Sequence, residues 1–356
     1  MMTESDARID RAAGCILGAF IGDALGLGPH WYYDLDELHC EYGPWITGYT
    51  APKAGRYHEG MRAGELSQTG LIMKFLLESL ATRKDYDESD FCRRLDEDFL
   101  PHLDGEARGG PGGYTNHSFR QVWKARVEEG RPWNYAAGNA DTSEAAERGS
   151  LLAARFAGDP GRVAHHVATN TRLSQNDSLV VQQSVAFALV LAALIRGEKF
   201  DKGISDKLMA DVEDGSVPFL AGSSIASAGT EKPELGFASP DALLLPSWIA
   251  QAASENQIDP PWKVSVVYGM SCAINFVLPG AYYLAARFGD DFESAVLHAV
   301  NGGGQNMSRA CLTGALVGAQ VGISRIPSRL IDGLVDGQEL VRLSREVVRT
   351  DAETQK

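Results

Sequence analysis

Glycine recurs at every fourth position in two stretches near opposite ends of this 356-residue chain. The first stretch holds Gly14, Gly18, Gly22 and Gly26, and the second holds Gly314, Gly318 and Gly322. A spacing of four places these glycines on one face of a helix. Each interior glycine costs a helix ~1 kcal/mol relative to alanine. Close approach of another backbone on that face would recover the cost, so the pattern predicts two tightly packed core helices.

The rest of the chain also favours helices. Apolar residues recur at helical spacing, most clearly in residues 70–83, 178–197, 241–256, 292–300 and 338–348. Alternation typical of strands is scarce. We therefore predict an all-α protein of about a dozen helices. No shift in composition marks a boundary, so we predict a single domain over residues 1–356. Three segments rich in turn residues are predicted loops: 105–113, 131–141 and 215–239.

The formal net charge is -14, and no run of Lys or Arg is present. Strong binding to nucleic acid or to an anionic membrane is therefore not expected. The five cysteines form no CxxC motif, which favours reduced thiols and a cytoplasmic location. The acidic N-terminus lacks the apolar segment of a signal peptide, and no transmembrane helix is predicted. The oligomeric state stays open.

Three motifs resemble the ADP-ribosylglycohydrolases. They are "GCILGAFIGDALGLGPH" from Gly14, "AGELSQTGLIM" from Ala63 and "NGGGQNMSRACLTGALVG" from Asn301. They occur in the family's order, and the resemblance covers about residues 12–322. It implies an orthogonal all-α bundle with an active cleft between the starts of the helices in the second and third motifs. The J-type lens crystallins share this fold, and the third motif is closer to theirs.

The chain departs from the family where its members hold two magnesium ions. The resemblance implies that the family's aspartates fall on Ser67, Gln68, Gln305 and Met307, and that a further glutamate falls on His30. Hard divalent cations need oxygen ligands with carboxylates among them, and a methionine sulfur is too soft for magnesium. We therefore predict no di-magnesium site, no other metal or cofactor, and a pocket lined by uncharged side chains and one imidazole.

His30 is the predicted general acid or base, because histidine titrates near neutral pH. Amides can donate and accept hydrogen bonds, aromatic rings can stack on a ligand, and the helix start after the glycine triplet 302–304 offers backbone N–H groups to an anion or carbonyl. The predicted substrate-binding residues are Trp31, Tyr32, Tyr33, His58, Gln68, Tyr114, His117, Asn301, Gln305 and Asn306. The alternative for each is packing or helix capping.

Three functions fit these features. The first is a metal-independent enzyme that acts on a small polar or glycosidic molecule between His30, Gln68 and Gln305. The second is a non-catalytic protein that binds such a molecule. The third is a crystallin-like structural role, which a cleft filled by side chains would favour.

Overall fold

The computed structural model describes residues 3–217 and 241–354. Within these ranges the chain forms sixteen α-helices and no strand. Their bounds are α1 Glu4–Leu27, α2 Leu35–Tyr42, α3 Gln68–Arg83, α4 Glu88–Arg94, α5 His117–Trp123, α6 Glu144–Phe156, α7 Pro160–Arg172, α8 Ser178–Ile195, α9 Ile204–Glu213, α10 Leu245–Ser254, α11 Val264–Tyr268, α12 Ile274–Arg287, α13 Phe292–Asn301, α14 Asn306–Val321, α15 Ser328–Asp332 and α16 Gly337–Thr354.

The two glycine-rich helices, α1 and α14, pack against each other more extensively than any other pair of elements. Their glycines meet in antiparallel order, since Gly14 faces Gly318 and Gly18 faces Gly314. A β-carbon added to Gly18 would lie 2.1 Å from the Gly314 carbonyl oxygen. The two helix faces thus touch backbone to backbone, and glycine is needed there for space.

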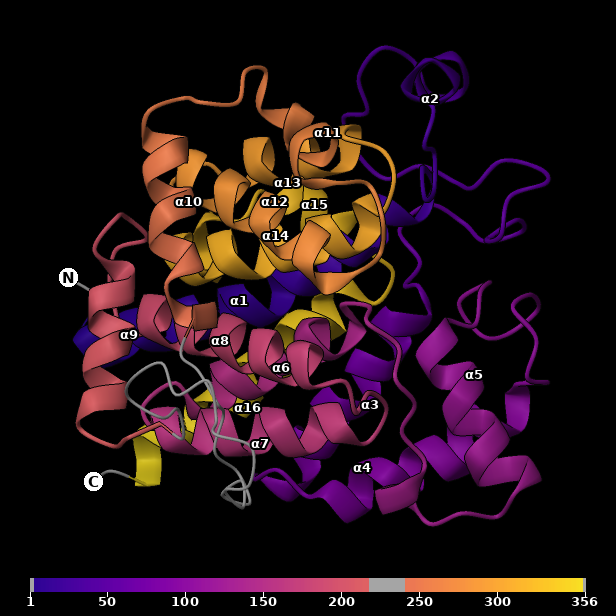
Figure 1. Ribbon diagram of the computed structural model, residues 1–356, viewed down its shortest axis with the longest axis horizontal. Coiled ribbons are helices and arrows are strands. Elements are labelled where there is room, and N and C mark those ends of the chain that lie inside the picture. Colours follow the sequence, from indigo (N-terminus) through magenta and orange to yellow (C-terminus); the bar gives the residue numbers. More distant parts are fainter. Residues whose placement is uncertain (1–2, 218–240, 355–356) are drawn as a thin grey trace, which may run out of the picture.

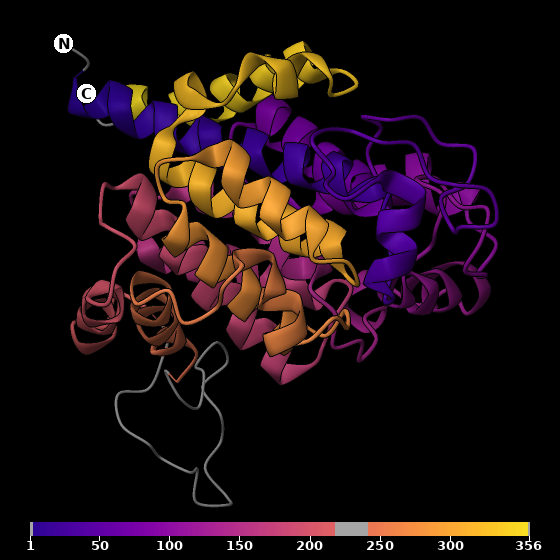
Figure 2. The ribbon, with the colours of Figure 1, turned by 90° about the horizontal axis from the view of Figure 1, so that it is seen from above.

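The other helices cover this pair on several sides (Figures 1 and 2). α16 packs against α1 and α3. α6 and α8 pack together on another side of the pair, and α12 and α13 pack along α14. α2 and α5, with the loops beside them, gather at one end of the molecule. The first residues of α14 lie at the end of α1, because Met307 contacts Gly26.

Some expectations need correction. Gly322 lies outside α14 as its C-cap, with a φ of +81°, so the second helix holds two of the three glycines. Most of the predicted loop 215–239 lies outside the described residues. Within residues 3–217 and 241–354, one helix, Ser178–Ile195, is long and apolar enough to cross a membrane, although 78% of it is buried inside the protein. Core helices of globular proteins have the same property.

Candidate functional site

The start of α3 is held by a buried carboxylate from α1. Asp23 accepts hydrogen bonds from the backbone N–H of Ser67, at 2.8 Å, and from its hydroxyl. The same hydroxyl oxygen accepts from the N–H groups of Thr69 and Gly70 and so caps the helix. Burial raises the pKa of Asp23 to about 6, against the opposing effect of these bonds. The Ser67 side chain is therefore committed to holding α3 in place.

Gln68, the next residue on α3, is also engaged by the chain itself. Its Nε2 donates to Thr115 Oγ1 at 3.2 Å, and its Oε1 accepts from the backbone N–H of Asn116 at 3.1 Å. Both partners precede α5. Gln68 is 3% exposed. The amide thus joins α3 to the segment before α5, and both of its ends already have a partner.

Gln305 precedes α14 and is equally occupied. Its Oε1 accepts hydrogen bonds from Trp31 Nε1 and from His30 Nε2, the latter at 3.1 Å. Its Nε2 donates to Ser308 Oγ at 2.8 Å. Met307, on the first turn of α14, packs onto Gly26, where an added β-carbon would lie 2.3 Å from the Met307 Cα. These residues connect the start of α14 to the end of α1 and to the residues that follow it.

The glycine loop before α14 does not offer the free N–H groups that we predicted. The Gly304 N–H donates to the Tyr32 carbonyl at 2.6 Å, and the Gln305 N–H donates to the Met270 carbonyl at 2.9 Å. The loop carbonyls are also engaged, since the buried Arg309 guanidinium donates to the Gly303 carbonyl at 2.6 Å. The prediction of an anion-binding turn was wrong for these groups. These N–H groups are occupied because the carbonyls of Tyr32 and Met270, in neighbouring loops, accept their hydrogen bonds.

His30 is directly bonded to a second histidine. Its Nδ1 lies 2.7 Å from His58 Nε2, and His58 Nδ1 lies 2.7 Å from the Gly112 carbonyl oxygen. The Trp31 ring stacks on His30 with centroids 4.3 Å apart, and Tyr114 meets Trp31 edge-on at 4.4 Å. All four ring nitrogens of the pair are therefore bonded within the chain, and none is left for a substrate in this conformation.

The partners of the His30–His58 pair set its number of protons. The indole of Trp31 can only donate, so the Gln305 atom that it contacts is the oxygen, and His30 Nε2 must donate as well. His58 Nδ1 must donate to the Gly112 carbonyl. The contact between the two rings needs one more proton. The bonded pair thus carries three protons and one positive charge, whereas burial lowers the pKa of both imidazoles.

This count predicts what NMR spectroscopy of labelled imidazoles detects. Where the bonded arrangement is populated, nitrogen-15 shifts should report protonated His58 Nδ1 and His30 Nε2 together with one proton shared by the facing nitrogens. Because burial disfavours the charge, this third proton should be lost on raising the pH, with a shift at the Trp31 indole. A His117→Gln variant is the control and should leave these signals in place. A pair that holds two protons while all the contacts persist would contradict the count.

A small cavity lies between these groups, with a volume of about 50 Å³. Sites for small-molecule ligands usually span ~300–1,000 Å³, so this space suits a few water molecules. Its lining brings together predicted and unpredicted residues: His30, Trp31, His58, Ser67, Gln68, Thr69, Tyr114, Asn116, His117, Thr142, Glu144, Cys272, Gln305 and Met307. The prediction of a lining with one imidazole and no charged side chain was wrong, because His58, His117 and Glu144 also contribute.

Sequence patterns did not indicate Glu144 or Cys272, whereas Asn116 lies in the glycine-rich loop beside the predicted residues Tyr114 and His117. Burial raises the pKa of Glu144, and burial followed by the nearby Glu144 raises the pKa of Cys272. Asn116 Nδ2 is buried and has no hydrogen-bond partner among the described residues. Glu144 starts α6, and Cys272 precedes α12. No motif marks them, since their place at the cavity depends on how distant helices pack.

Four predicted residues lie outside the lining of this cavity. The Tyr32 ring is covered by the Arg56 guanidinium, 3.7 Å from its centroid, and its hydroxyl donates to Glu41. Tyr33 is 54% exposed. The Asn301 amide bonds both backbone groups of Ile46. Asn306 is fully buried and donates to the Val300 carbonyl at 3.4 Å.

The donor set does not fit a pair of magnesium ions. Ser67 and the two glutamines are bonded within the chain, and a methionine occupies a fourth position. Glu144 is the carboxylate that lines the cavity, and one carboxylate balances little of the charge of two divalent ions. Within the described ranges, no group of three or more His, Cys, Asp or Glu residues is placed to hold a metal.

The chain belongs to the ADP-ribosylglycohydrolase family, whose model matches residues 4–356. A protein of Archaeoglobus fulgidus described as uncharacterized is 25% identical over 338 residues, covering 95% of this chain and 96% of its own. Crystallin J1A of Tripedalia cystophora is 23% identical over 368 residues, covering 96% and 98%. A solved structure titled ADP-ribosylglycohydrolase-related protein complex is 18% identical with a TM-score of 0.60, covering 96% and 98%. The predicted family and all-α fold are confirmed.

Proposed function

We propose that this chain is a non-hydrolytic member of the ADP-ribosylglycohydrolase family. Its role is structural and depends on its stable fold, without catalysis in the cleft. One observation carries the proposal: the cleft between the starts of α3 and α14 is filled by the chain's own side chains, which leave about 50 Å³. The amides and imidazoles that could bind a substrate are already hydrogen-bonded within the chain. The likeness to a crystallin, which extends over 96% of this chain, supports the same function.

An assay with ADP-ribosylated peptides tests this proposal. We expect release of ADP-ribose to equal the rate without protein, both with magnesium and with a chelator, while an active family member serves as the positive control. A saturable, magnesium-dependent release would overturn the proposal. Titration calorimetry with ADP-ribose gives an independent measure, and we expect no heat beyond dilution because the cavity cannot admit the ligand without breaking the Gln305 contacts.

The second candidate is a metal-independent enzyme for a small polar or glycosidic substrate. The orphan donor Asn116 Nδ2 and the buried Glu144 carboxyl favour it, because they face one cavity and have hydrogen-bonding capacity to spare. A carboxyl with a raised pKa is suited to general-acid chemistry. Glu144 is then a better acid than His30, whose nitrogens are bonded.

A panel of small glycosides in the presence of chelator separates the two candidates. Turnover that Glu144→Gln abolishes, and that the exposed-site control Glu213→Gln preserves, would establish the enzyme and reject the structural role. Absence of turnover in the wild-type protein across the panel would reject the enzyme for these substrates.

A further inference from the structure

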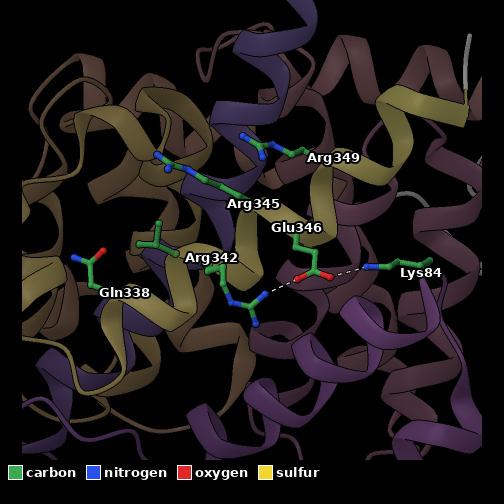
Figure 3. Close-up of a pocket in the computed structure, with 7 residues that line it drawn as sticks. Lys84, Gln338, Arg342, Arg345, Glu346 and Arg349 are labelled. Atoms are coloured by element: carbon green, nitrogen blue, oxygen red, sulfur yellow. Dashed lines mark hydrogen bonds and ion pairs between the residues drawn. The ribbon is translucent and has the colours of Figure 1, made fainter.

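A positively charged groove lies far along the fold from the cleft, between the end of α3 and one face of α16 (Figure 3). Its volume is about 560 Å³, which is within the range of small-ligand sites. Arg342, Arg345 and Arg349 line it from α16. Their spacing of three and four places them on one helix face. Lys84, the C-cap residue of α3, lines the opposite side.

The acidic residues nearby balance half of these charges. Glu346 pairs with Lys84 at 2.7 Å and with Arg342 at 2.8 Å, and Arg342 also pairs with Glu339 at 2.7 Å. Arg345 and Arg349 have no ion pair among the described residues and are exposed. Figure 3 draws them apart from the bridged group of Lys84, Glu346 and Arg342. In the part of the chain that the structure describes, the groove thus has two guanidinium groups without an ion pair, although the net charge of the protein is -14.

Two carboxylates on α1 lie near the same arginines and remain negatively charged while they accept hydroxyl hydrogen bonds. Asp6 and Asp10 line the neighbouring hollow together with Arg345 and Arg349. Asp6 accepts from the Thr3 hydroxyl at 2.7 Å, and Asp10 accepts from the Ser324 hydroxyl at 2.8 Å. Neither carboxylate forms an ion pair with Arg345 or Arg349 among the described residues. Like charges four residues apart destabilise a helix, so an anion between the two arginines would relieve part of their repulsion.

We propose that this groove binds a phosphate-bearing small molecule through Arg345 and Arg349, with Lys84 and Arg342 lining another part of the groove. Guanidinium groups form paired hydrogen bonds to phosphate oxygens, which gives them an advantage over point charges. The site is independent of the cleft, so it stands whether or not the proposed function of the cleft is correct. The sequence did not indicate it, because the charges come from separate turns of α16 and from α3.

Titration calorimetry with inorganic pyrophosphate tests the site in the full-length protein. We expect saturable one-to-one binding, weakened at least tenfold in the double variant Arg345→Gln/Arg349→Gln. The control Arg287→Gln removes an exposed arginine from the end of α12 and should bind as the wild type does. Circular dichroism checks that each variant is folded, and both arginines are exposed, so we expect no loss of fold.

Two outcomes would overturn the proposal. One is the absence of saturable binding at millimolar pyrophosphate in low salt. The other is equal weakening by Arg287→Gln and by the double variant, which would mean that pyrophosphate responds to overall charge and has no defined site.

Discussion

Replacing Gly18 with alanine should destabilise the protein by about 3 kcal/mol or more, the upper range for overpacking of a core. The new β-carbon would lie 2.1 Å from the Gly314 carbonyl oxygen and 2.7 Å from its carbon. Both atoms belong to the backbone of α14, which cannot turn aside as a side chain can. The gain in helix propensity, ~1 kcal/mol, is too small to offset this overlap. Urea denaturation followed by circular dichroism measures the loss.

Gly149→Ala is the matched control. Gly149 lies inside α6, and its nearest neighbour to an added β-carbon is the Val167 side chain at 3.3 Å. We expect a change within about 1 kcal/mol there, since the side chain can shift and the helix gains propensity. Equal stability of the Gly18 and Gly149 variants would contradict the direct backbone contact of α1 and α14.

Replacing Glu147 with glutamine should make the protein more stable than the wild type as the pH rises from 5 to 8. Glu147 is fully buried in α6, where burial and then the neighbouring Glu144 raise its pKa from 4.5 to about 8. Its proton is thus kept in the folded state but released from the unfolded chain over this range. The stability that the bound proton provides below pH 4.5 is lost as the pH rises through 8.

The expected difference is large. A shift of one pKa unit corresponds to ~1.4 kcal/mol, so the stability of the variant relative to the wild type should increase by roughly 4 kcal/mol between pH 5 and pH 8. Glutamine can still accept the bond that the Ser143 hydroxyl donates at 3.0 Å. The comparison uses free energies of unfolding across the range. The exposed-site variant Glu213→Gln should give a flat difference curve, and a flat curve for Glu147→Gln would contradict the buried, protonated carboxyl.

Sequence patterns were sufficient for the scaffold. The glycine spacing predicted close backbone contact on one face of α1 and of α14, because such contact compensates for interior glycines. That these two faces meet each other came from the structure. The apolar periodicity placed α3, α8 and α13 within a few residues of their bounds. These features are local, or repeat along one helix, so one chain displays them without reference to its fold.

The site was less predictable because its contacts join distant segments. The residues Ser67, Gln68, Gln305 and Met307 indicated that the carboxylates expected from the family are missing. We overestimated, however, how many hydrogen-bonding groups the polar side chains among them leave free. The polar side chains at these positions are hydrogen-bonded to residues that lie 2 to 275 positions away in the sequence. His58 could be named as a site residue, yet its bond to His30 follows from the loop that carries it. Glu144 was missed because α6 brings it to the cavity from a segment without a motif.

The difference between patterns along one helix and contacts between distant segments also explains why the role of His30 was not predicted. His30 alone in the sequence suggests a catalytic base. In the structure, its bonds to His58 and Gln305 make it part of a hydrogen-bonded connection among α1, α14 and the loop at Gly112. Buried polar groups of this kind stabilise a fold when every member has a partner. These bonds support a structural role for His30, whereas Asn116 Nδ2 at the same cavity has no partner among the described residues.

We propose that the chain's own uncharged amides and the His30–His58 pair fill the place where the resemblance to the family implies paired cations. The most direct test is an anomalous difference map from crystals soaked in manganese, which prefers the same oxygen ligands as magnesium. We predict no ordered manganese between Gln68 and Gln305, with the Trp31 and His30 bonds to Gln305 intact. Two strong peaks bridging the starts of α3 and α14, with these bonds broken, would contradict the account.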